Sequence, residues 1–346
     1  MNPLLGILLM AIGSAGAASF YVPIRKVKKW SWESYWLVQG LASWLIAPWI
    51  FSLLTVQELN TILSEVPLNA KLGAMVFGAL WGIGGLTFGL SMRYLGVALG
   101  QSIALGFCAA FGTLIPPVVS GENLFSSTSG ILMLIGVAIC IGGIAVIGYA
   151  GALKSKNMDE EERKKAVKEF ALKKGLIISV VAGVMSACMN YGINGIEGVI
   201  DAGNVFQETA KLHHVNELYI STPALIYVLL GGLITNFSYC IFLNIKNKTY
   251  KDYYSVTPLE FINNISFSFL GGTLWFLQFF FFGMGQSYLP ENMQVFGWSI
   301  LMALNISFAN IWGLILNEWK GAGKRAILTL VAGIIILIIS TFVVNF

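Results

Sequence analysis

The sequence predicts an all-α membrane protein with ten transmembrane helices arranged as two inverted five-helix repeats. Composition is the first observation: 56% of the 346 residues are hydrophobic and only 11% are charged, whereas soluble domains carry about a quarter charged residues. The second is a series of continuous apolar runs of about 20 residues, the length of helix that crosses a bilayer. The third is that basic residues gather in alternate loops. Lipid is therefore expected to be the main solvent of this chain.

Apolar segments that meet this length requirement recur along the whole sequence. Helices are favoured over strands because the runs are continuous and a helix satisfies its own backbone hydrogen bonds in lipid. No basic residues precede the first run, which predicts a retained span and not a cleaved signal peptide. The ten predicted spans cover residues 3–23, 33–56, 70–92, 95–118, 129–152, 175–197, 221–244, 264–287, 293–316 and 325–345.

The orientation of the spans follows from Lys and Arg. Of the 21 basic residues, 19 lie in alternate loops on one side, and only Lys71 and Lys211 lie on the other. Because cytoplasmic loops are enriched in Lys and Arg, these loops are predicted to be cytoplasmic. We therefore expect a multi-pass protein of the bacterial inner (plasma) membrane, with both termini outside the cytoplasm.

A charged segment divides the spans into two equal halves. Residues 1–152 form the first predicted five-helix repeat, 153–174 a cytoplasmic charged linker, and 175–346 the second repeat. Glu122 and Glu318 follow the fourth and ninth spans on opposite sides of the membrane, as inverted repeats with an odd number of spans require. We expect both to be interfacial residues. The aliphatic spans 129–152 and 325–345 are expected at the periphery, against lipid or a partner.

Polar side chains inside the spans indicate where a ligand binds, because each must find a partner in the membrane. Asn190 and Asn194 share one helix face by their spacing, and Trp275 and Gln278 share another. Amides flanked by Trp suit a neutral polyol, since amides bond hydroxyls and indole faces cover C–H surfaces. The alternative is bonding between helices, with Trp at lipid interfaces. The predicted substrate-binding residues are Tyr21, Trp81, Gln101, Asn190, Asn194, Trp275, Gln278 and Asn305.

Glu33 is the one acidic residue that falls within the start of a span. A carboxylate there loses hydration, which suits it to carry a coupling proton. The alternative is a helix N-terminal Glu that favours the helix dipole and pairs with Lys28, Lys29 or Arg93. For Arg93, in a tight cytoplasmic turn, a topology anchor is favoured over a gate that forms a salt bridge to Glu33.

Several classes of function are excluded by missing motifs. The sequence contains no HExxH, Walker or GxSxG motif, so neither an enzyme nor a primary ATP-driven pump is expected. No cofactor, metal site or nucleic-acid partner is predicted. The four cysteines lie in apolar stretches and are expected to be inert. His213 and His214 are expected to be solvated, and the glycines at 78, 82, 85 and 89 to pack helices together.

Four sequence blocks resemble the L-rhamnose–proton symporter family of the drug/metabolite transporter superfamily. They run in order from the first span to the last and so cover nearly the whole chain. The blocks are Ser19–Pro23 with Arg25–Glu33; Gly78–Gly84 with Met92–Gly96; Gly271–Trp275 with Leu277–Phe280; and Glu318-Trp319 with Ala322-Gly323 and Arg325. Where members of the family can carry a His and an Asp, this chain has Gln286 and Gln294. Because of this difference, Glu33 is favoured as the residue that carries the proton.

The resemblance implies a secondary active transporter that takes up L-rhamnose or a related 6-deoxyhexose with a proton, by alternating access. Sugar, proton and the lipid bilayer are then its partners, and the sequence does not distinguish a monomer from a homodimer. Residues of the predicted site that stand within matching motifs are Glu33, Trp81, Arg93, Asn194, Trp275 and Gln278. The alternative within the same superfamily is an exporter of amino acids or other small metabolites. A sensor or structural membrane protein would need no aligned polar face.

Overall fold

The protein is described here from a computed structural model of the chain, and the described part is helical throughout. The structure describes residues 2–95, 97–121, 123–157, 172–196, 198–294, 296–316 and 319–343. The predicted all-α class is confirmed for these residues. Glu122, Glu318 and most of the predicted linker 153–174 lie outside them.

The helices of the first half follow the predicted spans closely, with one short additional helix. Side-chain caps mark several starts; for example, Asn2 accepts the backbone N–H of Leu5, and Ser127 accepts that of Gly130. The elements are α1 (Pro3–Ser19), α2 (Tyr21–Ile24), α3 (Trp32–Leu41), η1 (Ala42–Ile46), α4 (Ala47–Thr55), α5 (Leu59–Glu65), α6 (Leu68–Leu95), α7 (Val97–Val119) and α8 (Thr128–Lys156).

The second half repeats this pattern of long helices joined by short ones. A capping box starts α13, in which Thr257 and Glu260 each bond the other's backbone N–H. The elements are α10 (Leu172–Asn194), α11 (Gly203–Leu212), η2 (Glu217–Tyr219), α12 (Thr222–Asn247), η3 (Thr249–Tyr253), α13 (Pro258–Ser287), α14 (Glu291–Gln294), α15 (Gly297–Ile315) and α16 (Lys324–Val343).

Within the described residues, eight segments are long and apolar enough to cross a membrane. Ile103–Val119 of α7 is a shorter apolar helix, and α16 coincides with the last predicted span. Large apolar side chains lie exposed on the outer faces; Leu54 is 77% and Ile245 66% exposed. Monomeric soluble proteins rarely expose such surfaces. The chain is therefore a multi-pass membrane protein.

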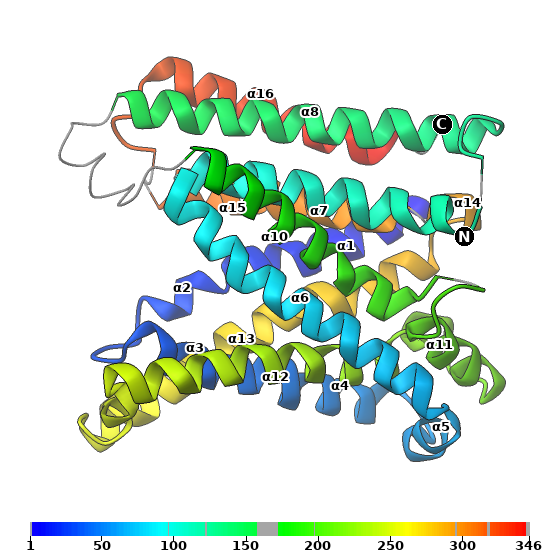
Figure 1. Cartoon of the computed structure of the whole chain (residues 1–346), viewed down its shortest axis with the longest axis horizontal. Coiled ribbons are helices and arrows are strands. Elements are labelled where there is room, and N and C mark those ends of the chain that lie inside the picture. The colour runs from blue at the N-terminus through cyan, green and yellow to red at the C-terminus, as the bar shows by residue number, and fades with distance from the viewer. Residues whose placement is uncertain are drawn as a thin grey trace.

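The two most aliphatic helices form an outer layer. α8 and α16 lie side by side along the top of Figure 1, and Gly143 of α8 meets Leu337 of α16. Ile135 and Ile335 are each about half exposed on the outside of this pair. The predicted peripheral position of both helices is thereby confirmed. The two helices pack against each other.

Glycines let several helix pairs approach closely, as predicted, but not at every position. A Cβ at Gly78 of α6 would collide with the Val228 carbonyl of α12, and one at Gly82 would lie 2.9 Å from Thr235. Gly85 and Gly89, in contrast, have no atom of the described residues within 4 Å of such a Cβ. The packing prediction is therefore wrong for these two, which lie on the exposed face of α6.

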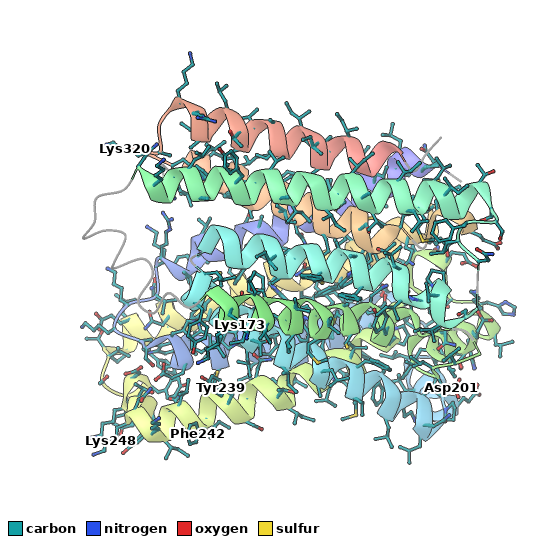
Figure 2. All side chains as sticks on the ribbon, turned by 45° about the horizontal axis from the view of Figure 1, so that its top comes forward. Lys173, Asp201, Tyr239, Phe242, Lys248 and Lys320 are labelled. Carbon is teal, nitrogen blue, oxygen red and sulfur yellow. The ribbon has the colours of Figure 1, made fainter. Side chains whose placement is uncertain are left out.

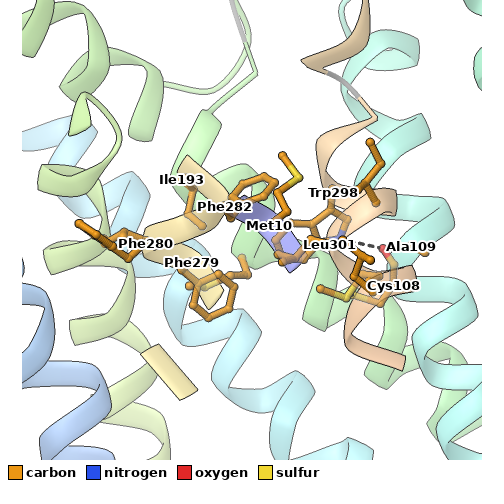
Figure 3. Close-up of a cluster of buried hydrophobic side chains, with 14 of the residues drawn as sticks. Met10, Cys108, Ala109, Ile193, Phe279, Phe280, Phe282, Trp298 and Leu301 are labelled. Atoms are coloured by element: carbon orange, nitrogen blue, oxygen red, sulfur yellow. Dashed lines mark hydrogen bonds between the residues drawn. The ribbon is translucent and has the colours of Figure 1, made fainter. Parts of the chain in front are cut away.

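The interior is closed by side chains from helices far apart in the sequence. Figure 3 shows Met10, Phe282, Trp298 and Cys108 meeting where α1, α13, α15 and α7 come together. The Trp298 indole N–H donates to the Cys108 carbonyl at 3.3 Å. This cluster holds α15 against α7 and α13, and so positions Gln278, one turn before Phe282 on α13, and Asn305, two turns after Trp298 on α15.

The two ends of the molecule differ in charge. Lys248 and Lys320 lie at one end and Asp201 at the opposite end, as Figure 2 shows. Residues 198–220, expected to be a loop at the Asp201 end, contain α11 and η2. The amphipathic face of α11 explains this helix, since Phe206 and Ala210 are fully buried against the bundle.

The second membrane segment is interrupted by a π-helical turn. α3 continues into η1, where the Ala47 N–H bonds the Ala42 carbonyl five residues back, and then into α4. A π-helical turn holds one residue more than an α-helical turn and often marks a functional site. Trp44 lies at the centre of this turn, and its side chain is only 3% exposed.

Candidate functional site

Two amide side chains, from α13 and α15, form a buried pair in the middle of the bundle. Gln278 is 5% exposed and donates to the Trp275 carbonyl one turn earlier, at 3.0 Å. Asn305 donates to Gln278 Oε1 at 2.9 Å. The pair therefore presents fixed donors and acceptors, and three of the predicted site residues lie together.

Several buried polar atoms without partners lie on helices that pack against α13. Asn305 Oδ1, Trp44 Nε1, Ser14 Oγ and Gln39 Oε1 are buried and have no hydrogen-bond partner among the described residues. More than nine in ten buried polar groups in proteins are paired, and an orphaned one costs about 1–3 kcal/mol. Each of these atoms can therefore accept or donate one more hydrogen bond, for example to a polar ligand.

Ser14 lies at the same height of the bundle as the amide pair. A Cβ on its neighbour Gly13 would lie 3.0 Å from the Gln278 Cα, so α1 and α13 are in backbone contact there. Ser14 is fully buried, and its hydroxyl can both donate and accept. α1, α13 and α15 thus each contribute a polar group to one layer.

Three indole rings lie beside this layer. The centroid of Trp44 lies 6.0 Å from that of Trp81 and 6.1 Å from that of Trp275, and Trp81 lies 5.5 Å from Trp275. Gly232 leaves room for the Trp81 ring, since a Cβ there would collide with it. Trp275 also packs on Phe279, at 5.2 Å. Aromatic faces next to amides suit a ligand with both C–H and hydroxyl surfaces.

Three predicted residues cannot be placed in the site. The side chains of Tyr21, Gln101 and Arg93 lie outside what the structure describes, although all three backbones are helical. Their predicted roles, including the Arg93 anchor or gate, stay predictions.

Asn190 and Asn194 belong to a different network. Asn194 donates to Asn190 Oδ1, and Asn190 donates to the Gly112 carbonyl of α7, both at 2.8 Å. Gln207 of α11 donates to Asn194 Oδ1 at 3.2 Å. The two amides share a helix face as their spacing predicts, but in this conformation they bond within the protein. This corresponds to the alternative of bonding between helices, and their substrate-binding role stays a prediction.

Glu33 lies in a third cluster, at the basic end of the molecule. It is 7% exposed in the first turn of α3, and its Oε1 accepts hydrogen bonds from Asn247 at 3.0 Å and Thr249 at 2.9 Å. These two donors join α3 to the end of α12 and to η3. The carboxylate thus connects α3, the end of α12 and η3.

A second carboxylate reinforces the Glu33 cluster. Asp252 accepts the Ser31 N–H at 2.7 Å and the Ser34 hydroxyl at 2.8 Å, which ties η3 to the start of α3. Burial raises the pKa of Tyr253, whose hydroxyl donates to the Ser34 carbonyl. The start of α3 is therefore held by neutral donors around two acidic groups.

The alternative partner Lys29 does not pair with Glu33. Its Nζ lies 2.8 Å from Glu260 Oε1 at the start of α13. This ion pair is exposed, so we expect it to contribute little to stability.

His213 is not simply solvated, as the sequence led us to expect. Its Nδ1 lies 3.2 Å from Glu58 and its Nε2 2.7 Å from Glu65, so it joins the end of α11 to both ends of α5. Hydrogen bonding to Glu65 and then Glu58 raises the pKa of His213. Among the described residues, no group of three or more His, Cys, Asp or Glu is placed to hold a metal ion.

A family model for the L-rhamnose-proton symport protein (RhaT) matches residues 2–346. The chain belongs to this family. The resemblance of the sequence blocks to this family is thereby confirmed over residues 2–346.

Relatives within the L-rhamnose-proton symport protein family are similar over their full length. A protein of Yersinia pestis (strain Pestoides F) named L-rhamnose-proton symporter is 37% identical over 346 residues, covering 99% of this chain and 97% of its own. One of Escherichia coli (strain K12 / DH10B) with the same name is 36% identical over 347 residues, with the same coverage. These relatives are transporters, the class that composition and missing motifs predicted.

Sequence reasoning missed several residues of the site in this member of the L-rhamnose-proton symport protein family. Trp44, Gln39 and Ser14 are each a polar group within an apolar span, which is the signal that identified Gln278. They were missed because the sequence does not show which helix each of these side chains faces. Gln39 and Ser43, for example, are one turn apart and bond each other. The π-helical turn that places Trp44 has no pattern in the sequence.

Proposed function

We propose that this protein takes up L-rhamnose or a related 6-deoxyhexose together with a proton across the bacterial inner membrane. Family membership supports this proposal, because relatives similar over their full length are named L-rhamnose-proton symporters. The buried layer around Gln278 supports it independently, since its chemistry suits an uncharged polyol.

The observation that carries the proposal is the set of orphaned polar atoms beside the indole rings. Asn305 Oδ1 is an acceptor and the Trp44 N–H a donor, and both are buried and unpaired among the described residues. Sugar hydroxyls donate and accept, so a bound sugar satisfies both. Trp81 and Trp275 cover its C–H faces, and Phe279 offers an apolar surface for the methyl group of a 6-deoxy sugar.

For the proton we propose Glu33. Two hydrogen bonds to Oε1 hold the carboxylate against Asn247 and Thr249. Protonation weakens such charge-assisted bonds, so the contact between α3 and the α12–η3 segment depends on whether Glu33 carries a proton. Because α3 leads through the π-helical turn to Trp44, the two sites lie on one continuous segment.

The mechanism we propose is alternating access by ten transmembrane helices in two inverted repeats, with both termini outside the cytoplasm. If only the sugar is bound, the Glu33 carboxylate stays charged and buried during the movement. If only the proton is bound, the amides of the sugar site stay unpaired. Both states are unfavourable by several kcal/mol. Coupled movement of sugar and proton follows from this penalty.

Uptake of labelled L-rhamnose by proteoliposomes containing the purified protein tests the function. We expect accumulation with an inward proton gradient and only equilibration without one. An amino-acid panel as competitor tests the exporter alternative. No uptake of L-rhamnose or of any other 6-deoxyhexose under either condition would contradict the proposal.

Glu33→Gln tests the proton site in the same vesicles. The amide keeps the shape of the side chain but cannot carry the proton, so we expect gradient-driven accumulation to be lost while sugar exchange without a gradient persists. Glu260→Gln is the matched control, because that carboxylate pairs with Lys29 at the same end of the molecule. Accumulation by Glu33→Gln at the wild-type rate would remove Glu33 from the mechanism.

A further inference from the structure

An apolar groove runs along the outer surface between α7 and α8. Its volume is about 450 Å³ and its walls include Ile103, Phe107 and Ile144. The floor consists of residues with little or no side chain: Gly106, Ala110, Ala145, Gly148 and Ala152. Where two packed membrane helices carry larger side chains, such a groove is filled by the protein itself. Here it stays open to the surrounding lipid.

The groove has the length of one lipid leaflet. Along α8 it extends from Ile141 to Ala152, which is about 16 Å at a rise of 1.5 Å per residue. Half of a hydrocarbon core about 30 Å thick is about 15 Å. One extended acyl chain of a single leaflet therefore spans the groove from end to end.

Among the described residues, the basic side chains near the groove lie at one of its ends. Lys156 is exposed and lies one turn beyond Ala152 on the same face of α8. The Lys154 ammonium lies 5.0 Å from the Trp319 ring centroid, and Lys173 is exposed at the start of α10, which packs on α7 through Gly183. This end belongs to the side of the membrane where the basic residues gather.

We propose that this groove binds one anionic phospholipid from the leaflet on the basic side. Its acyl chain lies between α7 and α8, and its phosphate meets Lys156. The half-exposed Tyr149 lines the groove within two turns of Lys156 and has a hydroxyl at its tip. An apolar channel with cations at one end matches the polarity of such a lipid.

A second copy of the chain fits this groove less well. A membrane helix is about 10 Å across with its side chains, whereas the floor here is a narrow channel between two helices already in contact. The basic end also disfavours a second copy, because a symmetric contact along this face brings like charges together.

Native mass spectrometry of the purified full-length protein tests the proposal. With added phosphatidylglycerol we expect one lipid to be retained, and with phosphatidylcholine at the same concentration none. Ala145→Phe places a ring in the groove and lowers phosphatidylglycerol affinity about tenfold. Ala138→Phe, the same change at an exposed position of α8 beyond the end of the groove, leaves it unchanged.

A second variant separates the charge from the apolar channel. The Lys156 side chain is exposed, so Lys156→Gln does not affect packing. We expect this substitution to weaken phosphatidylglycerol binding about fivefold. Three outcomes would overturn the proposal. They are equal retention of both lipids by the wild type, wild-type retention by both Ala145→Phe and Lys156→Gln, and a dimer that Ala145→Phe dissociates.

Discussion

Trp36 and Trp44 lie on the same membrane segment, 5.8 Å apart by ring centroid, yet their N–H groups have different surroundings. Trp36 donates to Asn236 of α12 at 3.2 Å. The Trp44 N–H is buried and unpaired among the described residues. The first bond contributes to stability, and the second group makes the proposed ligand contact.

Trp44→Phe removes this unpaired donor and retains an aromatic ring. Because a bound sugar loses one hydrogen bond to a buried group, we expect its affinity to fall about tenfold, while the melting temperature changes little. Isothermal titration with L-rhamnose and a thermal unfolding scan measure the two effects.

Trp36→Phe is the matched control, with the opposite pattern. It leaves Asn236 without its donor, so we expect a loss of about 1 kcal/mol in stability and unchanged sugar affinity. Equal loss of affinity in both variants, or none in Trp44→Phe, would place the sugar away from Trp44.

At the scale of residues, the sequence indicated which side chains are unusual but not their partners. Gln278 and Asn305, both expected in one site, are hydrogen-bonded to each other, because amides inside an apolar span need polar partners. Asn190 carries the same signal and bonds the Gly112 carbonyl instead. Spacing along a helix specifies the face of a side chain, whereas the neighbour on that face depends on tertiary packing.

At the scale of elements, His213 connects two short helices that lie outside the predicted spans. Glu58 and Glu65 face it from the two ends of α5, and on α11 Lys211 pairs with Glu208. The pKa of His213 is higher in the folded protein than in the unfolded chain. The contribution of its ion pairs to stability is therefore fully present below the unfolded pKa, and it is lost as the pH rises through the folded pKa.

We therefore expect the contact between α5 and α11 to loosen with increasing pH. Hydrogen exchange of the α11 amides, corrected for intrinsic rates, should be slower at pH 6 than at pH 8.5. His213→Gln abolishes this difference, and His214→Gln, the adjacent control, retains it. A difference that persists in His213→Gln would assign the pH dependence to another group.

The glycines of α6 provide a matched pair for helix packing. Gly78→Ala drives a methyl group into the Val228 carbonyl, and we expect a loss of about 1–3 kcal/mol in the free energy of unfolding. Gly85→Ala meets open space among the described residues and should be neutral or stabilising by up to about 1 kcal/mol. Thermal unfolding of the two purified variants measures both effects. Equal destabilisation of the two variants would contradict this account of the α6–α12 contact.

Element boundaries were predictable where hydrophobicity alone determines them. The predicted span 264–287 ends where α13 ends, but α13 starts earlier, at Pro258, because Thr257 and Glu260 cap a polar first turn outside the apolar run. The π-helical turn Ala42–Ile46 was not predictable, since it contains neither Gly nor Pro and, apart from Ser43, continues the apolar run. α11 was missed because its apolar face is too short to resemble a span.

At the scale of the whole molecule, charge predicts which end faces the cytoplasm. Leu212 and Leu259 are each 78% exposed at opposite ends, and the four native cysteines are buried. We expect Leu212→Cys to react with a membrane-impermeant maleimide in intact cells, and Leu259→Cys only after the membrane is disrupted. The reverse pattern would invert the proposed orientation.

The length of α13 sets the depth of the candidate site. Its 30 residues extend about 45 Å, well beyond a hydrocarbon core of about 30 Å. The first turns stay in the polar layer, because Asn263 and Asn264 bond backbone groups of the Lys26–Lys28 segment. Counted from there, Gln278 lies about 20 Å further along and about 14 Å before α13 ends at Ser287, inside the hydrocarbon core. A solute held at that depth is covered by the bilayer on both sides, so a modest tilt of the surrounding helices exchanges one exit for the other.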